Sequence, residues 1–211
     1  MTPGARRTVL AGVLWFWVLV GCTVQPAGTP MPSLHPEPEP PAVVRTETVS
    51  QQSWPLPTGI VIPAIGAESS DVVPLGLGRD RVIDVPPLSR VHQFGYYCPG
   101  GVGHCGSPLP GERGPSVVLA HVDGNGKLGL FNGLWKLKAG DAVNVNLAGG
   151  KVAHFTVKRV QIIAKTKFPT EAVYGVVDHP ALRLLTCGPG KAVAGSYLMQ
   201  TIIYADLKVI K

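Results

Sequence analysis

The residue in this chain best suited to nucleophilic chemistry is a cysteine at the end of an apolar run. Cys187 follows Leu184-Leu185-Thr186, and Gly188-Pro189-Gly190 turns the chain directly after it. A strand that delivers one thiol to its end is typical of covalent catalysis, in which the thiolate attacks an electrophilic carbon. Such a thiol needs a group within hydrogen-bonding reach that can take up and return a proton.

His121 is the candidate for that group among the six histidines. The apolar run at 117–120 predicts a buried strand, and the Val-Asp-Gly-Asn-Gly sequence at 122–126 predicts the turn that ends it. His121 is therefore expected to emerge at a strand end, as Cys187 does, and imidazole exchanges protons near neutral pH. The alternative is a histidine that only satisfies hydrogen bonds at the end of a strand.

Two further cysteines, Cys98 and Cys105, bracket a glycine-rich loop at 99–104. In an exported protein the default state of such a pair is a disulfide. A metal site that also uses His104 is the alternative, although no second pair of ligands stands at a suitable spacing. With these two cysteines paired, Cys187 is left either as a buried inert thiol or as a functional one.

The N-terminus predicts export. The pair Arg6-Arg7 precedes an apolar stretch at 9–20, which is shorter than the ~20 residues that a membrane-spanning helix needs. The stretch ends in Leu19-Val20-Gly21-Cys22, which resembles a bacterial lipobox, where the cysteine carries the lipid. We expect an export signal at 1–22 with Cys22 lipidated; the alternative is an uncleaved signal anchor. Both place the rest of the chain on the extracytoplasmic face of the membrane.

A proline-rich linker is predicted at 23–57, followed by one globular domain at 58–211. A largely polyproline II linker, at about 3.1 Å per residue, would hold that domain up to ~90 Å from the bilayer. With 45% hydrophobic and 15% charged residues, the chain has enough apolar material for one buried core. Its 26 glycines and 21 prolines favour short strands over long helices, so the expected fold class is all-β.

The net charge of +6 does not predict a nucleic-acid partner, because an exported domain does not meet nucleic acid. Anionic wall polymers or lipid head groups are the expected neighbours. The 13 acidic residues are spread along the chain without the clustering that a calcium site requires, and there is no nucleotide-binding loop. We therefore expect no metal and no cofactor.

Short strands bounded by glycine and proline dominate the pattern, as a barrel or sandwich requires. Short helices are expected at 130–137 and at 168–175, where Thr170 is the predicted N-cap and Gly175 follows the last turn. Strands are expected at 59–66, 72–77, 81–85, 117–120, 141–147, 151–164, 181–187 and 197–205, with 141–147 and 151–164 paired as a hairpin.

Taken in order, the motifs of this chain resemble the sortase family, and most closely the class F sortases of high-GC Gram-positive bacteria. The resemblance covers roughly 59–211, and the set in this order is specific although each part is weak. Its parts are Ile62-Pro63-Ala64-Ile65-Gly66, Val73-Pro74-Leu75-Gly76-Leu77, Val85-Pro86-Pro87, the run from Gly114 to Asp123, the run from Phe168 to Gly175, Leu182-Arg183-Leu184-Leu185-Thr186-Cys187-Gly188 and Ser196-Tyr197.

The resemblance implies a closed eight-stranded β-barrel with a few short helices, and a cysteine transpeptidase activity. In that scheme Cys187 attacks the Thr–Gly carbonyl of an LPxTG-like sorting signal in a secreted protein, which gives a thioacyl enzyme. His121 protonates the leaving amine. An amine acceptor, such as a cell-wall precursor or a pilin lysine, then resolves the thioester. The lipid or signal anchor holds the enzyme at the membrane of a Gram-positive-type envelope.

One part of the sortase pattern is missing. Sortases place an arginine on the strand after the cysteine to stabilise the oxyanion, but no arginine follows Cys187. Depending on register, Leu198 or Gln200 stands at the expected position, and Gln200 could donate a neutral hydrogen bond. Lys191 is a candidate cationic substitute. Thr186, directly before the nucleophile, is a further candidate for contact with the oxyanion or the substrate.

Three functions follow from these observations. The first is an active, slow sortase that acylates Cys187 and depends on His121. The second is a catalytically weakened, sortase-like lipoprotein that binds peptides or cell-wall components. The third is an L,D-transpeptidase, which also uses cysteine and histidine, but its usual Ser-x-Gly-Cys-Arg-like sequence is absent around Cys187.

Overall fold

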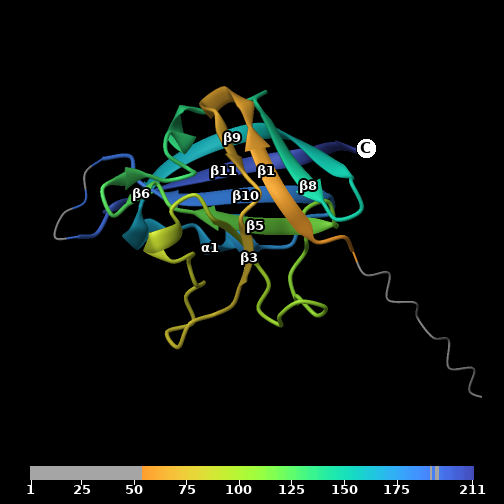
Figure 1. Cartoon of the computed structure of the whole chain (residues 1–211), viewed down its shortest axis with the longest axis horizontal. Helices are drawn as coiled ribbons and strands as arrows, with labels where there is room; N and C mark the ends of the chain where they lie inside the picture. Colours follow the sequence, from red (N-terminus) through yellow and green to blue (C-terminus); the bar gives the residue numbers. More distant parts are fainter. Residues whose placement is uncertain (1–53, 191, 193–194) are drawn as a thin grey trace, which may run out of the picture. The chain divides into compact units, whose positions relative to one another are not determined.

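The computed structural model describes residues 54–190, 192 and 195–211 (Figure 1). The predicted export signal, the lipidation site Cys22 and most of the predicted linker lie outside the described residues, as does Lys191. Within the described part, the helices are too short to cross a bilayer.

Nine strands form one sheet, and a separate two-stranded hairpin stands beside it. The sheet order is β2-β1-β8-β9-β11-β10-β5-β4-β3. Its strands are β1 (Pro57–Ile62), β2 (Ala67–Ser69), β3 (Val72–Leu75), β4 (Phe94–Tyr97), β5 (Gly114–Ala120), β8 (Ala142–Leu147), β9 (Val152–Ala164), β10 (Pro180–Cys187) and β11 (Met199–Ile210), and the hairpin consists of β6 (Asp123–Gly124) and β7 (Lys127–Leu128).

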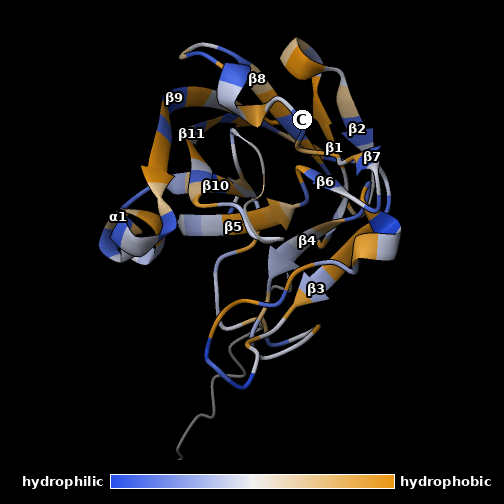
Figure 2. Cartoon of the chain, turned by 90° about the vertical axis from the view of Figure 1, so that its left-hand side faces the viewer, coloured by the Kyte–Doolittle hydropathy of each residue, from blue (hydrophilic) through white to orange (hydrophobic). Residues whose placement is uncertain are grey.

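The sheet curls into a nearly closed barrel, as Figure 2 shows from one end, and this confirms the expected β-barrel fold. It has nine strands rather than the expected eight. The short strand β3 adds to the edge of the sheet by pairing in parallel with β4. The predicted hairpin of β8 and β9 is confirmed, with Val143 opposite Phe155.

The two faces of the barrel wall bury different side chains because strand residues alternate. On β10 the side chains of Leu182 and Leu184 belong to the main core inside the barrel. Leu185, which points to the opposite face, packs outside against Val117 of β5 and Val173 of the helix α1 (Thr170–Tyr174). Figure 2 shows α1 outside the ring of strands, beside β5.

Three local expectations were wrong. The alternating segment 81–85 forms no regular strand. It folds back on its own loop, where Ile83 makes an isolated bridge with Leu77 and the N–H of Asp84 donates to the carbonyl of Gly76. In the predicted helix at 130–137 only Leu134–Lys136 is helical, as one 3-10 turn. Thr170 is the first residue of α1 rather than its cap, and Pro169 stands at the N-cap without a side-chain hydrogen bond.

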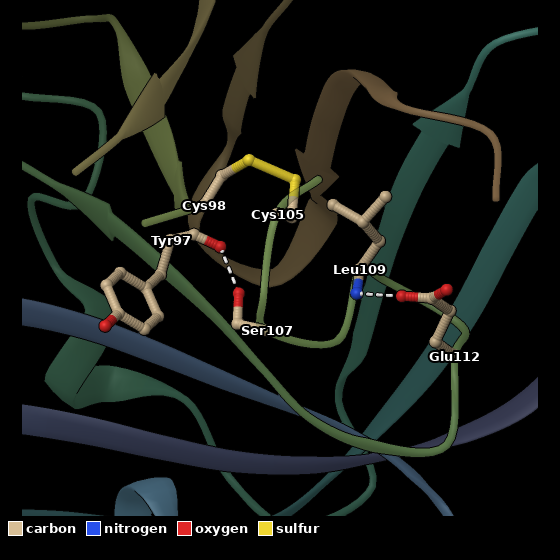
Figure 3. The surroundings of a disulfide bond; sticks show 6 residues. All are labelled: Tyr97, Cys98, Cys105, Ser107, Leu109 and Glu112. Carbon is tan, nitrogen blue, oxygen red and sulfur yellow. Dashed lines mark hydrogen bonds between the residues drawn. A yellow bond between two sulfur atoms is a disulfide. The ribbon is translucent and has the colours of Figure 1, made fainter. Parts of the chain in front are cut away.

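Cys98 and Cys105 form a disulfide (Figure 3). Cys98 is buried, and its backbone N–H donates to the carbonyl of Leu75 over 2.8 Å. The hydroxyl of Ser107 donates to the carbonyl of Tyr97 over 2.5 Å. The loop after β4 is therefore fastened to the barrel wall at both of its ends.

Candidate active site

The parallel pairing of β5 with β10 places His121 beside Cys187. The ladder runs to Leu185 opposite Leu119, and extending it by two residues on each side sets Cys187 opposite His121, the first residue after β5. The strands are still adjacent one step before, where the Thr186 hydroxyl donates to the carbonyl of Ala120 over 2.8 Å. Because neighbouring strands lie about 4.8 Å apart, the backbones of the two residues are close enough for thiol and imidazole to meet.

Gln200 stands on the other side of the cysteine. Cys187 pairs directly with Gln200 in the antiparallel ladder of β10 and β11. Residues directly opposite in a ladder point to the same face of the sheet. Cys187 and Gln200 therefore lie side by side on the outer face of the barrel, and His121, directly after the end of β5, continues this row on the other side of the half-buried thiol.

The ring of His121 is held by a backbone carbonyl from a distant loop. Its Nε2 lies 2.5 Å from the carbonyl oxygen of Pro86. A carbonyl only accepts, so Nε2 carries the proton and donates it. Nδ1 is consequently the ring nitrogen left to exchange a proton with Cys187 or with a substrate amine.

Two glycines shape the backbone at this site. Gly188 has φ +84°, so the chain turns immediately after Cys187 through a conformation that side chains disfavour. Gly129 packs so closely under the histidine that an added Cβ would overlap the backbone carbonyl of His121. The sequence offered no signal for Gly129, because its close approach arises from a contact eight positions away.

Thr186 has a structural task. Its side chain points into the barrel and is buried, and its hydroxyl is occupied by the Ala120 carbonyl. On the neighbouring strand the buried Thr201 hydroxyl donates to the carbonyl of Gly188 over 2.8 Å. These two hydroxyls fix the ends of β5 and β10, and neither is aimed at the outer face where a substrate would lie.

The first backbone donor after the nucleophile is also occupied. The N–H of Gly188 donates to the carbonyl of Met199 over 3.0 Å. An oxyanion on Cys187 must therefore find its donor elsewhere, and the Gln200 amide is on the correct face. Leu198 is two residues before Gln200, is 65% exposed and has no donor on its side chain. Of the two sequence candidates, Gln200 pairs directly with Cys187 and carries a side-chain donor, whereas Leu198 does neither.

A tyrosine and an aspartate link the loops that follow the two strand ends. The Tyr197 hydroxyl donates to the carboxylate of Asp123 over 2.5 Å. This bond raises the pKa of Tyr197 to about 12, with smaller contributions from burial and from the nearby charges of Asp123 and Cys187. A Cβ on Gly188 would lie between the Tyr197 ring and Val122, at 3.8 and 3.7 Å. The residues next to both reactive side chains are therefore held together.

Comparison with known proteins identifies the fold and the family. A family model described as Sortase domain matches residues 60–208. The chain belongs to the sortase family. The match runs from within β1 to within β11 and includes His121, Cys187 and Gln200. The curated proteins that were searched gave no match.

Solved sortases share the fold at low identity. Sortase C-1 from Actinomyces oris is 20% identical, with a TM-score of 0.53, over 72% of this chain and 73% of that one. The pilus-related sortase C of Group B Streptococcus is 21% identical, with a TM-score of 0.52, over 74% and 69%. Sortase C from Clostridium perfringens is 20% identical, with a TM-score of 0.50, over 73% and 70%. At these identities the structural likeness shows a common fold.

Proposed function

We propose that this sortase is a membrane-tethered, extracytoplasmic cysteine transpeptidase of the class F type. It cleaves an LPxTG-like sorting signal and transfers the acyl part to an amine. The observation that carries the proposal is the row of His121, Cys187 and Gln200 on one face of the barrel. It brings a nucleophile, a proton carrier and a neutral hydrogen-bond donor to one place.

The reaction divides into two acyl transfers. The Cys187 thiolate attacks the Thr–Gly carbonyl, and the amide of Gln200 donates to the oxyanion that forms. The C–N bond then breaks, and His121 gives its proton to the departing glycine amine. In the second half an acceptor amine attacks the thioester, His121 takes up the proton, and the thiolate leaves as a new amide forms.

Transfer of a sorting-signal peptide to an amine tests this proposal. The full chain is mixed with a library of LPxTG-like peptides and either triglycine or a lysine-containing peptide, and the products are measured by mass spectrometry. We expect an amide product that requires both Cys187 and His121. Cleavage that persists in Cys187→Ala would assign the activity to another protein in the preparation.

The missing arginine favours a second candidate, a weakened sortase-like lipoprotein that binds peptides or cell-wall components. Gln200 offers a neutral donor where a charged one would stabilise the oxyanion more strongly. This function predicts peptide binding that survives Cys187→Ala and no transfer product with any acceptor. Loss of all peptide affinity in Cys187→Ala would count against it.

A further inference from the structure

The loop between β3 and β4 contacts the proposed proton carrier through one buried residue. In the segment 84–90 every residue except Pro86 is exposed. The carbonyl oxygen of Pro86 accepts the hydrogen bond from Nε2 of His121 at 2.5 Å. Val85 and Leu88, close to Pro86 in the sequence, are 58% and 53% exposed. Apolar packing therefore does little to fix this segment, and its polar contacts decide where the Pro86 carbonyl lies.

An arginine four residues after Pro86 ties this segment to the start of the edge strand β3. Arg90 ends the 3-10 turn Leu88–Arg90, and its backbone N–H donates to the carbonyl of Pro87 over 2.8 Å. Its guanidinium donates twice to the carboxylate of Asp71, from Nη2 to Oδ1 over 2.6 Å and from Nε to Oδ2 over 3.0 Å. Two parallel bonds to one carboxylate fix direction as well as distance. The turn that follows the Pro86 carbonyl is thus held in one orientation.

Asp71 is itself fixed by the sheet. It directly precedes β3, and its carbonyl accepts a hydrogen bond of 3.0 Å from the N–H of Phe94, the first residue of β4. Its carboxylate also accepts a bond of 2.8 Å from the side chain of Gln93, which is buried. The Asp71 carboxylate therefore offers Arg90 a partner at a fixed place on the barrel.

The other side of the segment lies against the loop that follows His121. The side-chain amide of Asn125 donates to the carbonyl of Leu88 over 3.1 Å. The N–H of Leu130 donates to the carbonyl of Val91 over 2.9 Å. The segment is therefore held between the edge strand on one side and the loop of the histidine on the other.

We propose that Asp71 and Arg90 are positioning residues for His121. Their ion pair holds the segment whose Pro86 carbonyl accepts the Nε2 proton, and so keeps the ring in the orientation that leaves Nδ1 to exchange a proton. The inference rests on the transpeptidase function above, in which His121 delivers a proton to the departing amine. A ring without the Pro86 contact can rotate about its side-chain bonds, and general acid catalysis depends on where the acid is held.

The first test follows the ring proton itself and requires no turnover. In full-length protein with isotope-labelled histidine, the Nε2–H signal of His121 is assigned by its loss in His121→Gln. A hydrogen-bonded ring N–H exchanges slowly with water. The side chains of Arg90 and Asp71 are 57% and 34% exposed, so we expect exchange about five-fold faster in Arg90→Ala, the upper end of what such an ion pair contributes.

Arg79→Ala is the matched control for Arg90→Ala. Arg79 is an exposed arginine of the same loop, and within the described part of the chain it makes no ion pair. Its removal changes the net charge equally and should leave the exchange of the His121 ring proton as in wild type. Arg90→Lys keeps the charge but not the paired donors, so its exchange rate should lie between those of wild type and Arg90→Ala.

The second test separates proton delivery from binding. With a saturating sorting-signal peptide, Arg90→Ala should be acylated about five-fold more slowly than wild type, and the peptide affinity measured in the Cys187→Ala background should not change. A nitrophenyl ester of the same acyl peptide expels nitrophenolate as an anion and needs no proton from His121. With this ester, Arg90→Ala and wild type should be acylated at rates that agree within about two-fold.

Failure of this inference differs from failure of the proposed function. Unchanged exchange of the His121 ring proton in Arg90→Ala would overturn the inference, and so would an equal loss of rate with the peptide and with its ester. A lower thermal midpoint without faster exchange would show that the ion pair only stabilises the fold, which also contradicts the inference. Absence of acylation of wild type by every peptide would instead overturn the transpeptidase function, and the exchange measurement would still decide whether Arg90 holds the ring.

Discussion

The Thr186 hydroxyl donates a 2.8 Å hydrogen bond to the carbonyl of Ala120, and so joins the residues that directly precede Cys187 and His121. This bond lies inside the barrel, whereas the two reactive side chains point outward. The strand ends are thereby fixed from the buried side and not by the side chains of Cys187 and His121. Thr201 also acts from the buried side, because its buried hydroxyl donates to the carbonyl of Gly188.

Gln200 is expected to be the oxyanion donor. Because it pairs directly with Cys187, Gln200→Ala should lower the acylation rate about 100-fold, the usual loss for one donor. Gln200→Arg should raise the rate about ten-fold, since a charged donor is stronger. Leu198→Arg is the matched control. Rapid mixing followed by intact mass measurement gives the rates, and a rise in Leu198→Arg without one in Gln200→Arg would refute the assigned register.

The Tyr197–Asp123 bond should stabilise the domain in a pH-dependent manner. The hydrogen bond raises the pKa of Tyr197 to about 12, so its stabilisation is complete below the ordinary pKa of 10 and is lost as the pH rises toward 12. Tyr197→Phe should therefore lower the free energy of unfolding by about 1 kcal/mol at pH 8, and the difference should vanish near pH 12. Urea unfolding of wild type and Tyr197→Phe at several pH values measures this difference in the free energy of unfolding.

A double-mutant cycle separates this bond from general damage. In Asp123→Asn the pKa of Tyr197, followed by NMR of ring-labelled tyrosine, should fall toward 10. In the Asp123→Asn background, Tyr197→Phe should then lower the free energy of unfolding by little more. If the decreases in the free energy of unfolding of the two single variants add fully in the double variant, the two side chains do not act together.

Gly129 should be essential for the position of His121. An alanine Cβ there would overlap the His121 carbonyl, so we expect Gly129→Ala to destabilise the fold by about 2 kcal/mol and to slow acylation more than ten-fold. Gly76→Ala is the control, because its Cβ would meet only the Asp84 carboxylate, at 3.5 Å. Equal thermal midpoints and rates for both variants would contradict the close packing.

The Cys98–Cys105 disulfide should stabilise the domain without taking part in catalysis. Replacing both cysteines with serine should lower the free energy of unfolding by about 2 kcal/mol. Acylation by a short sorting-signal peptide should stay within two-fold of wild type, because the loop lies away from Cys187. A large loss of acylation in a folded double-serine variant would show that the loop reaches the reacting atoms.

The sequence predicted the strands that carry the site better than the contacts around it. Cys187 and His121 each end an apolar run before a glycine turn, and such local signals place both at strand ends. The donor at Gln200 could not be chosen over Leu198 without the register of β11, which depends on pairing across the loop at 188–198. The Pro86 carbonyl on His121 joins residues 35 positions apart and left no local pattern.

The segment 81–85 shows why alternation alone misleads. Its polar and apolar residues alternate as in a strand, yet only Ile83 pairs, within its own loop, through a bridge to Leu77. The carbonyl of Pro86 just beyond it accepts from His121 instead of joining a ladder. Tertiary position decided between strand and loop here, as strand propensity depends strongly on its neighbours.

The most direct test of the central claim is the mass of the intact protein after incubation with an LPxTG-like peptide library in the absence of an amine acceptor. We expect a thioacyl adduct whose added mass is that of the peptide up to its threonine less one water. The adduct should map to Cys187, disappear with hydroxylamine and be absent in Cys187→Ala. No adduct with any peptide, on folded protein whose Cys187 still reacts with a thiol reagent, would contradict the proposed function.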